Sequence, residues 1–211
     1  MSSPRPRRAR TDVRKQPAQQ RSRALVDALL EATGRVIAEG GLVALTTTRV
    51  AEVAGVSVGS LYQYFPSKEA LVAALIQDRL QRDEERVEAC CAALEGAPLE
   101  QVLRAIAEVV VAPFREAPVL YREMIAAMSA VEQERLVDAT LERCRAMTGA
   151  LLAPHRDRLT VRDVDLASYL AATAAVAIVR DAAQRRPELL EGDTLAEEIY
   201  IILARYLAGS G

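Results

Sequence analysis

The sequence has few aromatic residues and no tryptophan: aromatic residues make up 4% of the 211 residues, whereas hydrophobic residues make up 51%. The core must therefore consist mainly of Leu, Val, Ile and Ala, of which Leu and Ala are good helix formers. Glycine and proline are also scarce, at 10 and 9 residues, which argues against the many tight turns of an all-β fold. These scarcities favour an all-α protein.

Residues that carry enzyme or metal chemistry are also few. The chain has one histidine, His155, in an expected loop after Pro154, and three cysteines, Cys90, Cys91 and Cys144. They do not have the spacing of a zinc site, and the sequence contains no phosphate-binding glycine loop and no nucleophile elbow. We therefore expect no enzyme, no metal site and no cofactor. An odd cysteine count with two adjacent residues is typical of a reducing cytoplasm.

Long apolar segments are missing too. The longest candidate, residues 166–179, is interrupted by Ser168, Tyr169 and Thr173, and is too short to cross a bilayer. The positive charges near the N-terminus are not followed by an apolar run, unlike a secretory signal. We predict a cytoplasmic protein that does not contact a membrane.

The charge is distributed unevenly. Residues 1–68 carry 11 Lys or Arg against 5 Asp or Glu, a balance of +6, whereas residues 69–211 carry 16 against 24, a balance of −8. This asymmetry predicts that only the first part contacts a polyanion. Residues 1–16 should form a disordered basic arm, either a solvated tail or an aid to DNA binding. Its cations are Arg5, Arg7, Arg8, Arg10, Arg14 and Lys15.

Three helices are predicted within residues 17–66. The first is an amphipathic helix that ends at Gly40 and Gly41, because apolar residues recur at helical spacing at Leu25, Leu29, Ala32 and Val36. A short helix over 47–54, capped by Thr46, and a second over 58–65 are joined by a tight turn. Two short helices after a longer one predict a helix-turn-helix domain at 17–66.

The remaining sequence, 67–211, is predicted to form a second helical domain. A connecting helix should extend over 67–95, with Ser67 as its cap. Pro113 and Pro118 predict a break after a helix over 98–111. Further helices are expected over 119–128, 132–152, 160–186 and 194–207, the last with a capping box of Thr194 and Glu197. The whole chain would then have about nine helices.

The second short helix has two distinct faces. At 100° per residue, Val58, Leu61 and Phe65 lie on one narrow arc that can pack inward. The opposite arc presents Gly59, Ser60 and Gln63, which are small or can form hydrogen bonds to base edges in a major groove. Between the arcs, Tyr62 and Tyr64 can reach phosphate oxygens, although tyrosines on short helices also often cover a core.

Further donors lie close to this helix in sequence. Lys68 begins the connecting helix, where its ammonium and the helix N-terminus can act together on a phosphate. Thr47, Thr48 and Arg49 lie at the start of the first short helix. The combination of polar arc, tyrosines and cations predicts that this region binds DNA.

Residues 21–71 resemble the DNA-binding domain of the TetR/AcrR family of transcriptional regulators. Residues 45–71, LTTTRVAEVAGVSVGSLYQYFPSKEAL, have the family's Thr-rich start and then its pattern V-A-x-x-A-G-V-S-x-G-x-L-Y-x-Y-F-x-S-K-E-x-L. The resemblance implies a homodimeric repressor that binds a palindromic operator in double-stranded DNA and responds to a small effector. It also implies DNA contacts by Thr47, Thr48, Ser57, Gly59, Ser60, Tyr62, Tyr64 and Lys68.

Beyond residue 72 the resemblance implies only a helical ligand-binding and dimerisation domain. Small and apolar side chains on the last two predicted helices are candidates for a four-helix dimer interface: Ala172, Ala175, Val176, Ile199, Ile202 and Leu203. Apolar or amphipathic residues are candidates to line a cavity for a hydrophobic effector: Val110, Phe114, Tyr121, Met124, Met128, Met147, Tyr169 and Thr173. For each residue in both sets, ordinary core packing is the alternative.

Other functions remain open from the sequence. The same DNA-binding domain could serve a redox sensor that uses Cys90, Cys91 and Cys144, or a small-molecule-binding adaptor whose helix-turn-helix is vestigial. Activation instead of repression is also open, because the sequence does not reveal where an operator lies relative to a promoter.

Overall fold

The computed structural model describes residues 15–209, which form nine α-helices and no β-strand, as the all-α prediction requires. The helices are α1 (Lys15–Gly40), α2 (Thr47–Ala54), α3 (Val58–Tyr62), α4 (Lys68–Ala93), α5 (Leu99–Glu116), α6 (Pro118–Ala127), α7 (Glu134–Leu152), α8 (Val164–Arg185) and α9 (Thr194–Ala208). Short 3-10 turns occur at Leu42–Ala44, Ser129–Val131, Ala153–Arg158 and Pro187–Leu190. Lys15 begins α1, whereas the arginines of the predicted arm lie outside the described residues.

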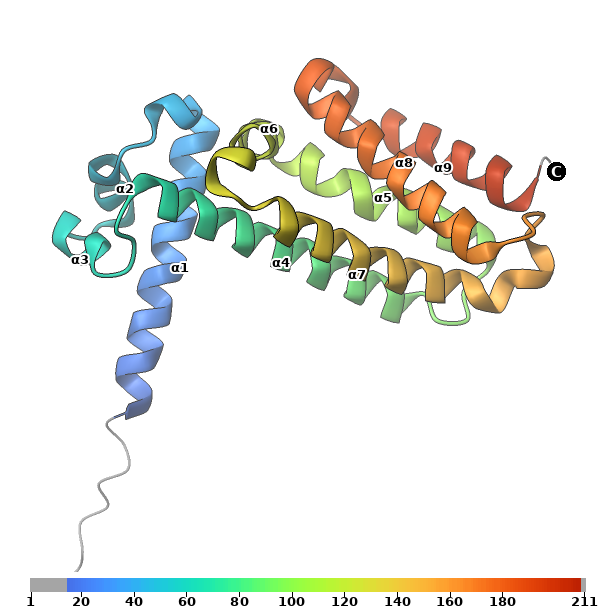
Figure 1. The fold of residues 1–211 in the computed structure, drawn as a ribbon, viewed down its shortest axis with the longest axis horizontal. Helices are drawn as coiled ribbons and strands as arrows, with labels where there is room; N and C mark the ends of the chain where they lie inside the picture. The colour runs from blue at the N-terminus through green and yellow to red at the C-terminus, as the bar shows by residue number, and fades with distance from the viewer. Residues whose placement is uncertain (1–14, 210–211) are drawn as a thin grey trace, which may run out of the picture.

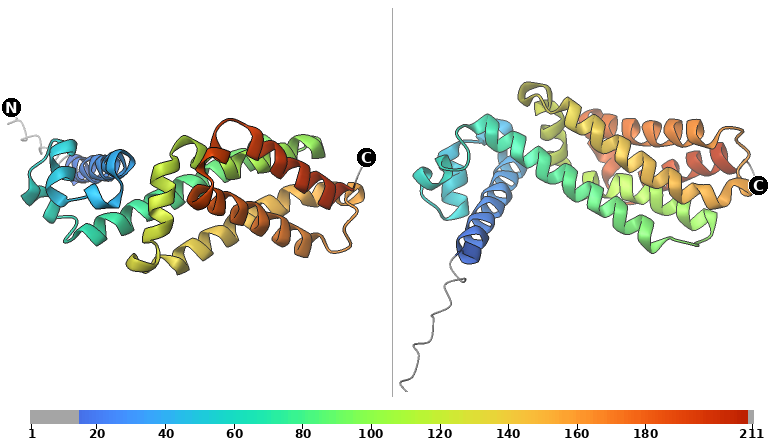
Figure 2. Two further views of the ribbon diagram at one scale, coloured as in Figure 1. Left: turned by 90° about the horizontal axis from the view of Figure 1, so that it is seen from above. Right: turned by 60° about the horizontal axis from the view of Figure 1, so that its bottom comes forward.

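The helices form a small N-terminal head and an elongated body (Figure 1). Helices α1, α2 and α3 make up the head, and α4 runs from the head along one side of the body. In the body, α4 packs on α7, α5 packs on α9, and α8 contacts α5, α6 and α7. Helix α6 crosses at the junction of head and body in both views of Figure 2, and it contacts α1 as well as α8.

The head has its own hydrophobic core. Leu29 from α1, Val50 from α2 and Leu61 from α3 are all fully buried in it. The core does not stop at the predicted boundary after residue 66, because α4 contributes Leu71 and Leu75. Helix α6 adds three further buried residues to the same cluster, Leu120, Met124 and Ala127. The head is therefore completed by parts of the chain that follow the helix-turn-helix.

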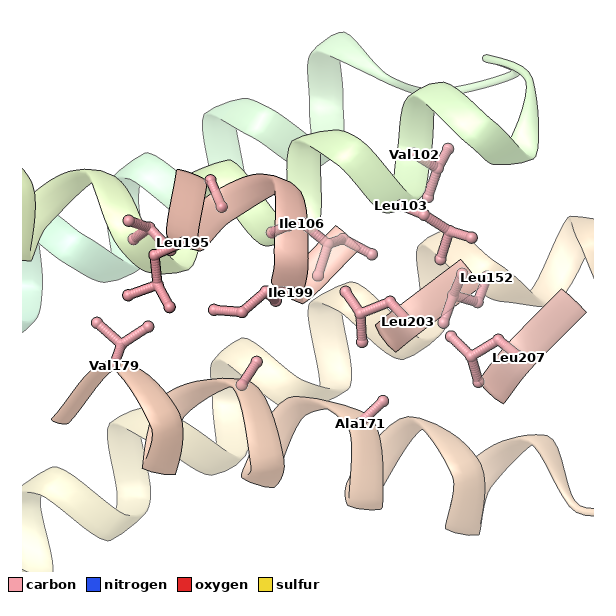
Figure 3. Packing of buried hydrophobic residues seen from close by; sticks show 14 of the residues in the cluster. Val102, Leu103, Ile106, Leu152, Ala171, Val179, Leu195, Ile199, Leu203 and Leu207 are labelled. Carbon is pink, nitrogen blue, oxygen red and sulfur yellow. The ribbon is translucent and has the colours of Figure 1, made fainter. Parts of the chain in front are cut away.

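The body core lies between α5, α8 and α9 (Figure 3). Leucine and isoleucine side chains of α5 and α9 pack together there, and small residues of α8 such as Ala171 belong to the same cluster. Leu103 and Ile199 are almost completely buried, and full burial of each such side chain contributes about 1.5–3 kcal/mol to stability. The body core therefore consists mainly of aliphatic side chains packed between closely spaced helices, as the low aromatic content predicts.

Helix α8 is the one described helix that is long and apolar enough to cross a membrane by composition, contrary to the sequence reading of residues 166–179. It lies within the bundle, and Ala167, Ala171, Ala175 and Val179 on one of its faces are buried in the body core. Core helices of this kind have the same composition as membrane spans, so packing accounts for the apolar character of this face.

Three helix-end predictions were wrong. Pro113 does not break a helix but lies in the last turn of α5, where only three residues follow it, and the break comes at Ala117. Helix α3 ends at Tyr62 instead of Phe65. Thr194 is the first residue of α9, preceded by Asp193 as N-cap without a side-chain hydrogen bond, so no capping box forms. The Glu197 carboxylate instead accepts a hydrogen bond from the Arg104 guanidinium at 2.5 Å.

Candidate nucleic-acid interface and internal cavity

Local hydrogen bonds hold the two short helices of the head in place. Thr46 caps α2 by accepting a hydrogen bond from the Arg49 amide at 3.1 Å, and Ser57 caps α3 by accepting one from the Ser60 amide at 3.0 Å. Between them, Gly55 has a φ of 71°, in the left-handed region. A residue with a side chain would be strained there, so the turn that sets the orientation of α3 depends on this glycine.

The two faces of α3 differ as the sequence predicted. Leu61 is completely buried in the head core, whereas Tyr62 on the next position is 50% exposed. Gly59 and Gln63 are also exposed, and Ser60 is half-buried. The Tyr62 hydroxyl forms a hydrogen bond of 3.1 Å with the Thr47 hydroxyl, which joins the exposed side of α3 to the start of α2.

The other predicted DNA-binding side chains differ in how exposed they are and in whether they have partners within the protein. Thr48 is exposed, and Arg49 is exposed with a 3.7 Å ion pair to Glu52, an arrangement that contributes little to stability. Tyr64 is half-buried and packs against the head core. Lys68 is half-buried and donates a hydrogen bond of 3.0 Å from its ammonium to the Leu42 carbonyl. Lys68 therefore has a structural partner that the sequence did not reveal.

A contact between body and head was also missed by sequence reasoning. The Glu123 carboxylate of α6 accepts a hydrogen bond of 3.0 Å from the Leu42 amide, and the same carboxylate is paired with Arg122 at 3.2 Å. The peptide groups of Leu42 are thus held on one side by Glu123 and on the other by Lys68. A side chain at Gly41 would approach the Glu123 carboxylate to 3.3 Å. Residues 81 positions apart make this contact, and nothing in a single sequence indicates it.

The body contains a cavity with two adjoining chambers. The inner chamber has a volume of about 120 Å³ and lies between α4, α5, α6, α7 and α8; the outer chamber has a volume of about 400 Å³ and lies mainly between α5, α7 and α8. The two share seven lining residues, six of which are apolar or a thiol: Val87, Val109, Val110, Leu141, Cys144, Val176 and Arg180.

Most of the predicted ligand-binding residues lie at this cavity. Thr173 lines the outer chamber, and five others line the inner chamber: Val110, Phe114, Tyr121, Met124 and Met128. Met147 and Tyr169 line neither chamber, and Tyr169 is 48% exposed with its ring beneath the Arg145 guanidinium. Helical periodicity alone does not reveal which way a helix is turned, so the sequence did not separate these two residues from the six that line the cavity.

The inner chamber holds an acid that the sequence did not single out. Asp83 accepts hydrogen bonds from the Tyr121 hydroxyl at 2.8 and 2.9 Å to its two oxygens. Burial raises the pKa of Asp83 from 3.8 to about 6, and the Tyr121 hydrogen bond opposes this rise. Burial also raises the pKa of Tyr121. In the sequence, Asp83 lies within a run of charged residues that predicts a solvated face, so its burial could not be foreseen.

Comparison with known proteins gives matches in both halves of the chain. The family model of bacterial regulatory proteins of the tetR family matches residues 29–75, and that of the tetracyclin repressor-like C-terminal domain matches residues 98–207. The transcriptional repressor KstR of Rhodococcus jostii is 31% identical over 180 residues, which cover 78% of this chain and 82% of KstR. The chain belongs to the TetR family.

Solved structures agree with this membership at the level of the fold. A TetR-family regulator from Mesorhizobium loti has a TM-score of 0.68 at 19% identity, over 89% of this chain and 98% of that one. RolR in complex with resorcinol has a TM-score of 0.56 at 20% identity, over 90% of each chain. The TetR family consists of DNA-binding transcriptional regulators and not of enzymes.

The three cysteines of this TetR-family protein are half-buried. Burial raises the pKa of Cys90 and of Cys91, and it raises the pKa of Cys144 to about 11. All three are free thiols. Since the thiolate is the reactive form, these shifts lower the reactivity of each thiol at neutral pH.

The predicted dimer residues of this TetR-family protein divide into two groups. Ala175, Ile199 and Leu203 are at most 3% exposed, because they pack against α5 and within the α8–α9 core; their place in a subunit interface stays a prediction. Ala172 and Val176 line the outer chamber, and only Ile202 is exposed, at 48%. Sequence reasoning missed the apolar residues that do reach the surface of these helices: Leu166, Leu170 and Tyr206.

Proposed function

We propose that this TetR-family regulator is a homodimeric repressor that binds a palindromic operator through two copies of α3 and is released by a small, largely apolar effector. The observation that carries the proposal is the position of α6. Its Glu123 holds the Leu42 amide of the head, while its Tyr121 and Met124 line the inner chamber. Met124 is also part of the head core. One short helix therefore contacts both the effector cavity and the DNA-binding head.

On the DNA side, the exposed arc of α3 supplies the proposed contacts. Gly59 permits close approach of the backbone, and Ser60 and Gln63 can form hydrogen bonds with base edges in the major groove. Tyr62, Tyr64, Lys68 and residues at the start of α2 would contact phosphates, with the Thr47–Tyr62 hydrogen bond fixing their relative position. The α2 residues are Thr47, Thr48 and Arg49, and Ser57 would act from the N-terminus of α3.

A second copy of the chain is proposed to pack on the exposed side of α8 and α9. Leu166, Leu170, Ile202 and Tyr206 present 43–54% of their surface there. The last three line a groove of about 310 Å³, to which the buried residues Ala171, Ala175 and Leu203 also contribute. Contiguous exposed apolar surface of this kind is typical of subunit interfaces. Two heads placed by such a dimer would meet successive major grooves about 34–36 Å apart.

On the effector side, binding in the cavity would favour an arrangement of α6 in which the heads no longer fit the operator. Because the coupling free energy is reciprocal, operator DNA must weaken effector binding by the same factor. A regulator that binds operator DNA would act in the cytoplasm, where bacterial DNA lies.

The test is selection of bound sequences from random duplexes with purified protein, followed by affinity titration at two salt concentrations. We expect an inverted repeat, bound by a dimer in sedimentation analysis, with affinity that falls as salt rises. Failure to recover any motif in the absence of effector would contradict the proposal. A reporter gene behind the recovered site would distinguish repression from activation.

A further inference from the structure

Two arginines line the outer chamber, and they differ in how well their charge is satisfied. Arg145 donates hydrogen bonds to the Leu141 carbonyl and to the Thr173 hydroxyl, both at 3.2 Å. Its guanidinium also pairs with Glu142 at 3.5 Å and lies over the Tyr169 ring. Arg145 is therefore held in place by the protein itself.

Arg180 has no comparable set of partners. Its guanidinium lies 3.8 Å from the Met128 sulfur, and a thioether is a weak acceptor for a group with five N–H donors. Among residues 15–209, no carboxylate lies within the 4.0 Å of an ion pair from this guanidinium. The outer chamber does have one carboxylate in its lining, that of Asp181, but this carboxylate pairs with Arg185 at 3.1 Å. Arg180 is thus a half-buried cation without a counter-charge.

Arg180 lies where a bound ligand could supply the missing counter-charge. It lies in the wall that the inner and outer chambers share, where the other shared residues are aliphatic side chains and Cys144. A guanidinium pairs strongly with a carboxylate, because two parallel charge-assisted hydrogen bonds can form between them. An anion carried by a ligand would supply the counter-charge that the protein lacks there.

The inner chamber restricts what the rest of that ligand can be. Most of its lining is aliphatic or aromatic, with Phe114 and Met124 among them. Its acidic group is Asp83, which is already bonded through both oxygens to Tyr121. A second anion placed at this end would face the Asp83 carboxylate and be repelled by it, with Arg86 and Arg79 offsetting part of that charge. The ligand should therefore be neutral and mainly apolar where it enters the inner chamber.

We propose that the effector is an amphipathic monocarboxylic acid whose carboxylate pairs with Arg180 and whose apolar body extends into the inner chamber toward Tyr121. This assignment rests on the proposed function, in which this cavity takes the effector. It goes beyond that function by naming the charged group that the effector carries and the residue that recognises it.

The experiment compares four ligands of equal chain length by calorimetric titration of the full-length dimer: octanoate, octan-1-ol, octylamine and octanedioate. We expect octanoate to bind about tenfold or more tightly than octan-1-ol. Octanedioate should bind more weakly than octanoate, and Asp83→Asn should narrow that difference. Operator binding and helical circular dichroism of each variant confirm that it is folded.

Variants at Arg180 separate recognition of charge from general apolar binding. Arg180→Gln should remove the preference for octanoate over octan-1-ol, Arg180→Lys should keep much of it, and Arg180→Glu should shift the preference to octylamine. Arg158→Gln is the control, because this exposed arginine lines neither chamber; it should leave all four affinities unchanged.

Several outcomes would overturn the inference. They are equal binding of octanoate and octan-1-ol, a preference that survives in Arg180→Gln, or no binding of any of the four ligands. Since operator selection is done without ligand, its failure is a separate result. Recovery of an operator together with charge-independent ligand binding would leave the proposed function standing and reject the carboxylate assignment alone.

Discussion

The head and the body of this TetR-family protein place their functional groups in opposite ways. In the head, the proposed DNA-binding side chains lie on or directly after two short helices and at the start of α4, on positions close together in sequence. In the body, the polar groups of the cavity lie inside and come from helices far apart in the chain, such as Asp83 on α4 and Tyr121 on α6. The head can therefore be interpreted from a local motif, whereas the body can be interpreted only from its packing.

The largest expected effect tests whether head and body are separate in stability and function. Leu61→Ala in the head core and Leu103→Ala in the body core should each lower the free energy of unfolding by about 2–5 kcal/mol, because both side chains are almost fully buried. Leu61→Ala should also abolish operator binding, since α3 loses its anchor. Thermal unfolding and gel-shift titration measure the two effects. Equal loss of operator binding in Leu103→Ala would contradict the separation.

A second prediction concerns the buried acid of the body. The pKa of Asp83, about 6, lies above the ordinary value of 3.8. Between these two pH values the folded chain therefore binds the proton of Asp83 more tightly than the unfolded chain does. Stability therefore falls as pH rises through this window, by up to about 3 kcal/mol. Asp83→Asn should be more stable than the parent at about pH 7.5, and the difference should shrink toward about pH 4.

Denaturant unfolding of the parent and of Asp83→Asn across this pH range provides the measurement. The pKa values of Glu84 and Glu116 are lowered by arginine partners, so the stability that these two groups contribute to the protein is lost on acidification. The effect of Asp83 must therefore be taken as the difference in stability between the two proteins at each pH. A pH-independent difference between parent and variant would show that Asp83 does not titrate in this window.

A third prediction concerns the link between the two regions. Glu123→Ala removes the acceptor of the Leu42 amide, which should cost about 1.5–3 kcal/mol locally for a bond to a charged acceptor. Hydrogen exchange at Leu42 should become faster, and the effect of an effector on operator affinity should decrease. Glu123→Gln keeps an acceptor oxygen and should stay closer to the parent. Unchanged exchange in Glu123→Ala would mean that α6 does not hold the head.

The smallest expected effects separate two kinds of DNA contact within the head. Lys68→Met should weaken binding to operator and random duplexes alike and reduce the salt slope by about one. Gln63→Ala should leave random binding unchanged and lower discrimination at one or two base pairs by about 1–3 kcal/mol. If the salt slope is unchanged in Lys68→Met, the ammonium serves only its hydrogen bond to the Leu42 carbonyl.

Features of the head were more predictable from the sequence than features of the body. The caps at Thr46 and Ser67 were predictable because each side chain accepts a hydrogen bond from an amide three residues later in the chain. Burial of Leu61 beside an exposed Tyr62 follows from helical periodicity. The dimer residues were less predictable, because an apolar stripe such as that of α9 can face a second subunit or α5, and periodicity is the same in both cases.

The sequence by itself determined the all-α class, the helix-turn-helix and its exposed polar arc, because short-range hydrogen bonds and the spacing of apolar residues depend only on neighbours in the chain. Only the tertiary structure decided that Asp83 is buried against Tyr121, that Glu123 holds the Leu42 amide and that Arg180 lies between two chambers without an acidic partner. These contacts join residues on different helices, and their energies depend on burial and distance, which arise only when the helices pack.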